Sequence, residues 1–136
     1  DYDYQVASEF RLFAKKRNTT IYLNAHGVTS ALRNIHHSGH EYEGLPKPLS
    51  IGDVEGGGKW GNRADDTICI FRYTGSKTDW MYSNISVLKV KENETGGRPT
   101  PHEEPIKLKM KVNNVGFEYL GKDLLHNTQP VQKLNV

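Results

Sequence analysis

The sequence has little of the features that would assign a functional class at once. Its 136 residues include one cysteine, Cys69, which excludes an internal disulfide framework and predicts a reducing compartment. No apolar run approaches the roughly 20 residues that cross a bilayer, and no signal-peptide pattern opens the chain. Lys and Arg number 18 against 16 Asp and Glu, so the charge does not by itself indicate nucleic acid. These absences predict a single cytoplasmic domain with no membrane partner.

Hydrophobic periodicity predicts an α/β chain. Apolar side chains recur at helical spacing over residues 4–17, and the apolar run Ile21-Tyr22-Leu23 after them predicts a short buried strand over 20–26. That order is typical of the second half of a βαβ unit, so we expect this strand to lie in a parallel part of the sheet.

The rest of the chain predicts further strands and loops. Residues 67–73 are expected to neighbour the 20–26 strand and to be covered on both faces, and the strands after them to extend the sheet antiparallel. The additional elements expected are strands over 81–91, 105–112 and 117–120, helical turns within 28–34 and 56–62, and loops over 27–52 and 92–105.

The run Gly56-Gly57-Gly58-Lys59 suggests a P-loop but does not fit one. A P-loop needs Gly, four residues, then Gly-Lys and a hydroxyl residue, because the hydroxyl must reach magnesium. Here Asp53 stands at the first glycine and Trp60 follows the lysine. A glycine turn can still bind the phosphates of a nucleic-acid backbone through its amides, and a purely structural tight turn remains the alternative.

Three histidines lie close together in the long loop. His36, His37 and His40, with Glu41 and Glu43 nearby, offer metal-binding side chains. Their spacing matches no closed zinc pattern, so no metal site is predicted.

Other polar residues each have a structural and a functional interpretation. His26 ends an apolar strand at its carboxyl end, where α/β sites lie, and is either structural or catalytic. Asp65-Asp66 precedes its strand and is expected to cap or to form salt bridges. Lys89 and Lys91 point to the same strand face and need an anion or solvent. Cys69 is expected to be a buried inert thiol, and the glycosylation sequons at Asn18, Asn84 and Asn93 to be chance matches.

Read in order, four segments resemble the C-terminal half of the RecA-like motor of ring-shaped replicative helicases, the DnaB-type, Twinkle and phage primase-helicase families. They span roughly residues 4–112 and read LFAKKRNTTIYLNAH, IGDVEGGGKWGNRADDTICIFRY, ISVLKVKENETGG and PIKLKM. The second is the most specific, because it matches the family's order of Asp, small-residue turn, amide side chain, Ala-Asp, apolar strand and Arg. The positions concerned are Asp53, Gly56 to Gly58, Asn62, Ala64-Asp65, Ile68 to Phe71 and Arg72.

The resemblance implies a role for particular residues. His26 matches the sensor of the nucleotide γ-phosphate, and the loop with Arg33 and Lys47 matches a segment that faces the DNA channel. Lys89 and Lys91 match the paired basic residues that reach a neighbouring subunit's triphosphate, although the family usually has arginine as the finger. The second DNA-facing element is matched by Gly57, Gly58, Lys59 and Asn62.

The resemblance also implies what the chain works with. Its relatives bind ATP and Mg²⁺, form hexameric rings and act on single-stranded DNA in a bacterial or phage-infected cell. Neither a Walker A lysine nor a Walker B aspartate is present, so we expect residues 1–120 to be part of a longer RecA-like motor, inactive alone, and 121–136 to be a tail. The alternatives are a stand-alone module that binds nucleic acid or self-associates, and a RecA-like recombination ATPase.

Overall fold

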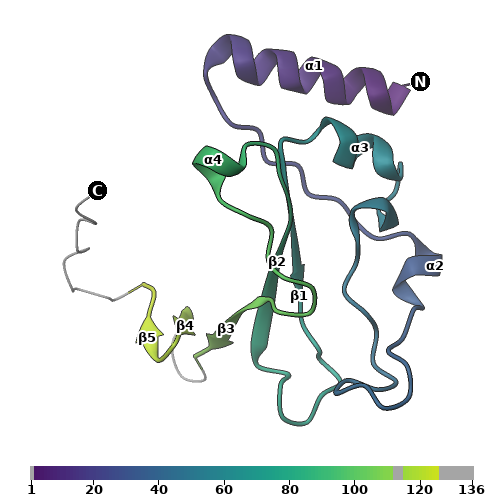
Figure 1. The fold of residues 1–136 in the computed structure, drawn as a ribbon, viewed down its shortest axis with the longest axis vertical. Coiled ribbons are helices and arrows are strands. Elements are labelled where there is room, and N and C mark those ends of the chain that lie inside the picture. The colour runs from purple at the N-terminus through teal and green to yellow at the C-terminus, as the bar shows by residue number, and fades with distance from the viewer. Residues whose placement is uncertain (1, 112–114, 126–136) are drawn as a thin grey trace.

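The computed structural model describes residues 2–111 and 115–125 as a mixed α/β structure (Figure 1). Four helices, one 3₁₀ turn and five strands follow one another along these residues. In chain order they are α1 (Tyr2–Arg17), α2 (Thr29–Leu32), η1 (Ile51–Asp53), α3 (Gly58–Arg63), β1 (Asp66–Phe71), β2 (Tyr82–Val90), α4 (Asn93–Gly96), β3 (Ile106–Met110), β4 (Phe117–Tyr119) and β5 (Lys122–Asp123).

The five strands form one sheet in the order β1-β2-β3-β4-β5, and each strand pairs antiparallel with its neighbour. A register shift between Thr67 and Ile68 interrupts the pairing of β1 with β2. The antiparallel extension predicted from residue 81 onward is therefore confirmed. β1 is an edge strand of this sheet, with one side of its backbone unpaired by any described strand.

The parallel strand predicted over residues 20–26 does not form within the described structure. This segment runs extended below α1 without a strand partner, and Tyr22 and Leu23 are exposed. A short apolar run forms a strand only where a neighbouring backbone accepts its hydrogen bonds. Here the pairing begins one residue later, at an isolated antiparallel bridge between Gly27 and Val54.

The predicted N-terminal helix is confirmed as α1, which packs across α3 (Figure 1). The Arg63 guanidinium lies 4.3 Å from the centre of the Tyr4 ring and links the two helices. Of the expected apolar face of α1, Phe10 and Phe13 remain substantially exposed, and Ala7 is the buried residue. α1 therefore carries apolar surface that the described residues do not cover.

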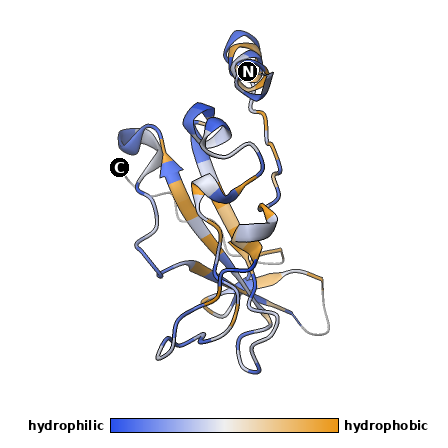
Figure 2. Ribbon diagram, turned by 90° about the vertical axis from the view of Figure 1, so that its right-hand side faces the viewer, coloured by the Kyte–Doolittle hydropathy of each residue, from blue (hydrophilic) through white to orange (hydrophobic). Residues whose placement is uncertain are grey.

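Strand register sorts the side chains of the central strands into two rows that face opposite ways. Phe71 pairs with Asn84, which pairs with Lys107, so these three form one row across the sheet. The adjacent row is Ile70, Ile85 and Ile106, on the other face. Figure 2 shows the hydrophobic stretches that run along the two long strands.

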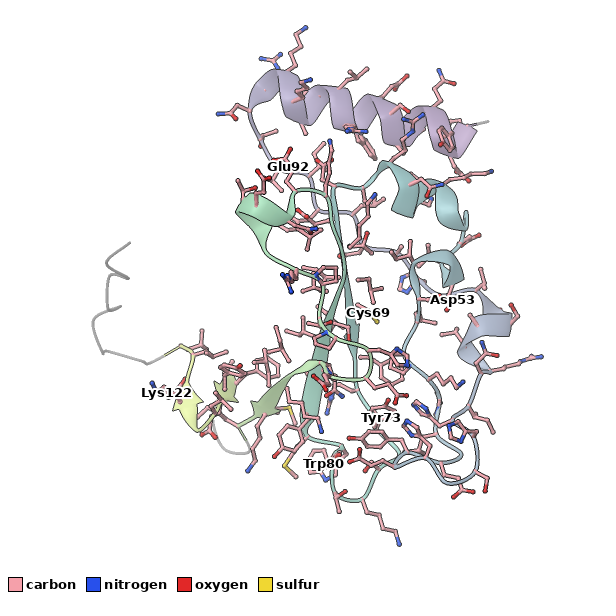
Figure 3. All side chains as sticks on the ribbon, in the orientation of Figure 1. Asp53, Cys69, Tyr73, Trp80, Glu92 and Lys122 are labelled. Carbon is pink, nitrogen blue, oxygen red and sulfur yellow. The ribbon has the colours of Figure 1, made fainter. Side chains whose placement is uncertain are left out.

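The face that carries Phe71 and Asn84 is covered by the described loops, whereas the opposite face is open along β1. The Leu49 backbone N–H donates to the Cys69 thiol, and the labelled Cys69 points from β1 toward this loop in Figure 3. On the opposite face Ile68 is 56% and Ile70 is 71% exposed. The prediction that β1 is covered on both faces is therefore wrong for the described structure.

The C-terminal part adds two short strands to the far edge of the sheet. The strand predicted over 117–120 is confirmed as β4, and β5 follows it inside the stretch expected to be a tail. Lys111 forms an ion pair with Asp123 that holds β5 against the end of β3. Val112 of the predicted 105–112 strand, and the rest of the predicted tail after residue 125, lie outside the described residues.

Candidate functional site

The glycine turn before α3 depends on conformations that favour glycine. Gly56 and Gly57 have φ of 86° and 63°, in the left-handed region, and the helix begins at Gly58. A Cβ on Gly56 would also lie 2.6 Å from Nε1 of Trp60. The sequence therefore places Gly57, Gly58, Lys59 and Asn62 on or beside one short helix, as predicted.

A short backbone ladder joins the predicted sensor His26 to this turn. The Glu55 N–H donates to the His26 carbonyl at 3.1 Å, and the Val28 N–H donates to the Asp53 carbonyl at 2.8 Å. Asp53 is in turn fixed by Ser50, whose backbone N–H and hydroxyl both donate to its carboxylate and lower the pKa of Asp53. The His26 side chain is exposed beside this ladder.

Lys89 and Lys91 both reach the junction between α3 and β1. The Lys89 ammonium donates to the carbonyls of Gly61 and Ala64, at 2.8 and 2.7 Å, at the C-terminal end of α3. Lys91 lies 3.3 Å from the Asp65 carboxylate, as expected of a salt-bridging aspartate. The same-face placement predicted for the two lysines agrees with these contacts.

Arg33 and Lys47 lie apart from α3 in the long loop. Arg33 is the C-terminal cap of α2 and is exposed. The Lys47 N–H donates to the Asn34 carbonyl at 2.9 Å, and Lys47 lines a cavity on the covered face of the sheet. Of the nine residues predicted for the site, seven are therefore grouped around α3 and its connections, and these two are not.

The cavity measures about 710 Å³ and lies between the sheet, the histidine loop and the proline-rich segment after α4. Tyr42 and Tyr73 stack there with ring centres 3.8 Å apart and planes 11° apart, and Phe71 meets Tyr73 edge-on. Figure 3 shows the labelled Tyr73 among the ring side chains that gather at this place. Burial is the main cause that raises the pKa of Tyr73, to about 12, so its hydroxyl stays neutral at ordinary pH.

His36 and His40 form the polar rim of the cavity with Glu103. Their rings stack at 3.9 Å, His36 Nε2 hydrogen-bonds the Tyr73 hydroxyl at 2.9 Å, and His40 Nε2 lies 2.9 Å from Glu103 Oε1. Burial, followed by the nearby His40, lowers the pKa of His36, so His36 is held neutral. The hydrogen bond from His40 lowers the pKa of Glu103.

These three side chains are the metal-binding candidates among the described residues. Their donor atoms all lie within 4.8 Å of one another. However, the Tyr42 N–H donates to His40 Nδ1, so neutral His40 carries its proton on Nε2 and donates it to Glu103. A metal ion bound at Nε2 would require the proton to be on Nδ1, where it would face the Tyr42 N–H and remove that hydrogen bond. The cluster is thus hydrogen-bonded in a way that opposes a metal ion.

Sequence reasoning missed several residues of the cavity. Glu103 lies 63 positions from His40 and joins it only through the tertiary fold. In the sequence, Asn84 was singled out only as a glycosylation sequon. It lies in β2 and is 3% exposed, and this burial agrees with a chance match to the sequon. A polar residue in the middle of the apolar 81–91 pattern was the one available signal.

Comparison of the chain with protein-family models, with curated proteins and with solved structures finds no match. None of the helices in the described ranges combines the length and the apolar character that crossing a bilayer demands.

Proposed function

We propose that this chain is the C-terminal part of the motor of an ATP-driven ring helicase that moves along single-stranded DNA. In this proposal a RecA-like core is completed by further strands that bind ATP and Mg²⁺, and six copies form the ring. The chain contributes the nucleotide sensor His26, a DNA-facing turn at Gly57 and Gly58, and the trans-acting Lys91.

The observation that carries the proposal is the ladder between residues 26–28 and 53–55. A motor must transmit the state of its nucleotide to the loops that hold DNA, and a rigid backbone connection can do so. The His26 carbonyl accepts a hydrogen bond from the Glu55 N–H, and Glu55 directly precedes the glycine turn. The two elements that the resemblance assigns to nucleotide and DNA are thus mechanically joined.

The open side of β1 supports the proposed larger core. Ile68 and Ile70 present an apolar face, and the strand's outer edge has no described partner. Exposed apolar surface beside an unpaired edge favours additional strands and helices there. We place the parallel strands of the proposed motor along this edge.

Lys89 and Lys91 take different parts in the proposal. The carbonyls of Gly61 and Ala64 surround the Lys89 ammonium, which keeps α3 in place relative to β2. Lys91 is held by one exposed carboxylate, Asp65, and this pairing contributes little energy in water. Lys91 can therefore exchange Asp65 for a phosphate of a neighbouring subunit at small cost.

The test uses the longer protein that carries this chain together with a P-loop. Lys91→Ala should reduce DNA-stimulated ATP hydrolysis on the order of 10³-fold and leave nucleotide affinity nearly unchanged, because a finger acts in the transition state.

Asp65→Ala is the matched control, since it removes the same ion pair but keeps the lysine. Turnover in Asp65→Ala should stay near the wild-type rate. An equal loss in both variants would show that the ion pair only supports the fold, and normal turnover in Lys91→Ala would remove the finger assignment.

A further inference from the structure

The segment between α1 and the Gly27–Val54 bridge is extended but has no strand beside it. Residues 19–26 belong to no helix or strand, and every residue from 15 to 26 is exposed. None of the backbone groups of residues 20–25 has a backbone hydrogen-bond partner among the described residues. Ile21, Tyr22 and Leu23 are 38%, 89% and 52% exposed. The segment therefore has the conformation and the apolar side chains of a strand, and its backbone is free to pair.

The outer edge of β1 has the complementary property. The backbone of β1 pairs with β2 alone in the described structure, and residues 66–71 take part in none of the described loop hydrogen bonds. The free N–H and C=O groups of an edge strand are a template for a strand from another chain. Ile68 and Ile70 present exposed apolar side chains beside this edge. One chain therefore carries both a free strand and a free edge.

Within one copy, Leu49 lies between the segment and β1. The segment ends at Gly27, and a Cβ on Gly27 would lie 2.7 Å from Cδ1 of Leu49. The Leu49 backbone N–H in turn donates to the Cys69 thiol of β1. Because Leu49 separates the end of the segment from β1, the strand that fits this edge comes from a second copy.

Charge favours one direction for the added strand. The basic run Lys15-Lys16-Arg17 precedes the segment, and the acidic pair Asp65-Asp66 lies where β1 begins. Neither the basic run nor Asp66 forms an ion pair with a described residue. A parallel arrangement places the basic run beside the acidic pair, whereas an antiparallel one places it beside Arg72. The complementary charges therefore favour a parallel strand.

The alternation of side chains favours one register. Ile21 and Leu23 face the same way in an extended strand, as Ile68 and Ile70 do in β1. With Ile21 beside Ile68, Leu23 lies beside Ile70 and both apolar pairs leave water. A shift of one residue would instead place the polar Asn24 beside Ile70.

We propose that residues 20–24 of one copy add as a parallel strand to the free edge of β1 in a second copy. Donor and acceptor are different surfaces of the chain, so each copy can donate to one neighbour and accept from another, which closes a ring or a reciprocal pair. This contact does not depend on nucleotide or DNA. It goes beyond the helicase proposal by naming the strand that lies next to β1, where that proposal places parallel strands.

The first experiment measures association of the 136-residue chain by sedimentation equilibrium over a range of protein concentrations. The wild-type chain should associate, and hydrogen exchange at the amides of residues 20–24 should slow as the concentration rises. Leu23→Asp should weaken the association about tenfold or more, because it places a carboxylate beside Ile70 of the second copy.

Leu12→Asp is the matched control, because Leu12 is also an exposed leucine, at 67%, but lies on α1. It should associate as wild type does. Both variants should unfold at the wild-type urea concentration when the protein is dilute, since neither leucine is buried within one copy. A chain that stays monomeric at every concentration, unchanged association in Leu23→Asp, or an equal loss in both variants would overturn the proposal.

The second experiment uses Cys69 to test the register. Tyr22 lies beside Cys69 in the proposed pairing, so Tyr22→Cys should form a disulfide with Cys69 of a second copy under mild oxidation. Leu23→Cys, which faces the other way, is the control and should not. A mixture of the wild-type chain with the double variant Tyr22→Cys, Cys69→Ser should give a one-to-one cross-linked dimer by mass spectrometry.

Three results of the cross-linking would contradict the proposal. A disulfide within a single Tyr22→Cys chain would show that the segment reaches its own β1. A dimer linked through two Cys69 side chains would show that two β1 edges pair directly. Equal cross-linking of Tyr22→Cys and Leu23→Cys would show that no fixed register exists.

Discussion

Two adjacent rows of the same three strands meet different surroundings. Phe71 and Asn84 lie under the histidine loop and line a cavity with polar groups, whereas Lys107 at the end of their row is exposed. One residue along, the isoleucine row of Ile70, Ile85 and Ile106 is apolar and uncovered at both ends, with Ile70 71% and Ile106 38% exposed. The described chain thus covers the more polar face of its sheet and leaves the more apolar face open.

This reversal explains how little of the chain is fully buried. Ala7, Ala31 and Tyr73 are the buried apolar residues of the described structure, and no large side chain is completely enclosed. An apolar face that stays open costs free energy in water, so it favours association with other polypeptide. The covered face, by contrast, keeps a cavity of about 710 Å³ between the sheet and its loops.

The largest expected difference in the free energy of unfolding is between substitutions at two neighbouring residues of β1. Phe71→Ala should lower the free energy of unfolding by about 2 kcal/mol, because the ring packs beneath Tyr73. Ile70→Ala should change it by less than about 0.5 kcal/mol, because the side chain is mostly in solvent. Urea unfolding at low and high protein concentration measures both. Equal losses at low concentration would contradict the contrast between the faces.

A second contrast of covered and open positions is found on α3. A Cβ on Gly61 would lie 2.0 Å from Cγ2 of Ile51, whereas the nearest atom to a Cβ on Gly58 is 3.9 Å away. Gly61→Ala should therefore destabilise the chain by about 1–3 kcal/mol, since η1 must move. Gly58→Ala, its control, should be neutral or stabilise by up to about 1 kcal/mol. Thermal unfolding of both variants checks this, and similar melting temperatures would disprove close packing of α3 on η1.

The covered face should also make stability depend on pH. Burial lowers the pKa of His36 below its usual 6.5, so between these values the unfolded chain binds more protons than the folded one. The free energy of unfolding should therefore fall as the pH drops through about 6.5. His37, His40, Lys47 and Glu103 are the charged or titratable groups that act on His36. His36→Gln should make the free energy of unfolding less dependent on pH, as measured by denaturant titrations at several pH values. An unchanged pH dependence would show that it arises from another group.

The sequence predicts the local helices and strands of this fold but not its tertiary contacts. The alternation of Ile106, Leu108 and Met110 with lysines sufficed to predict β3, and helical spacing sufficed for α1. The run at 21–23 predicted a strand that does not form, because an apolar run does not reveal whether a partner strand lies beside it.

The cavity was beyond prediction for a related reason. Its rim joins His40 to Glu103, and its floor depends on the register that sets Asn84 between Phe71 and Lys107. The spacing of these residues along the chain indicates neither the His40–Glu103 contact nor the strand register. The α3 region was predicted better, because its residues are close in sequence and a glycine turn dictates its backbone.

The smallest effect expected is that of zinc on the covered face. His36, His40 and Glu103 are close enough to share an ion, but the Tyr42 N–H occupies His40 Nδ1 and fixes the proton on the nitrogen that a metal would need. Zinc binding would stabilise the folded chain in proportion to its affinity, so a bound ion would be visible in thermal unfolding. We expect no shift of the melting temperature on adding zinc or a chelator. A zinc-dependent rise that His40→Ala abolishes, and that His37→Ala at the neighbouring exposed position retains, would show that the loop rearranges and that this rim is a metal site.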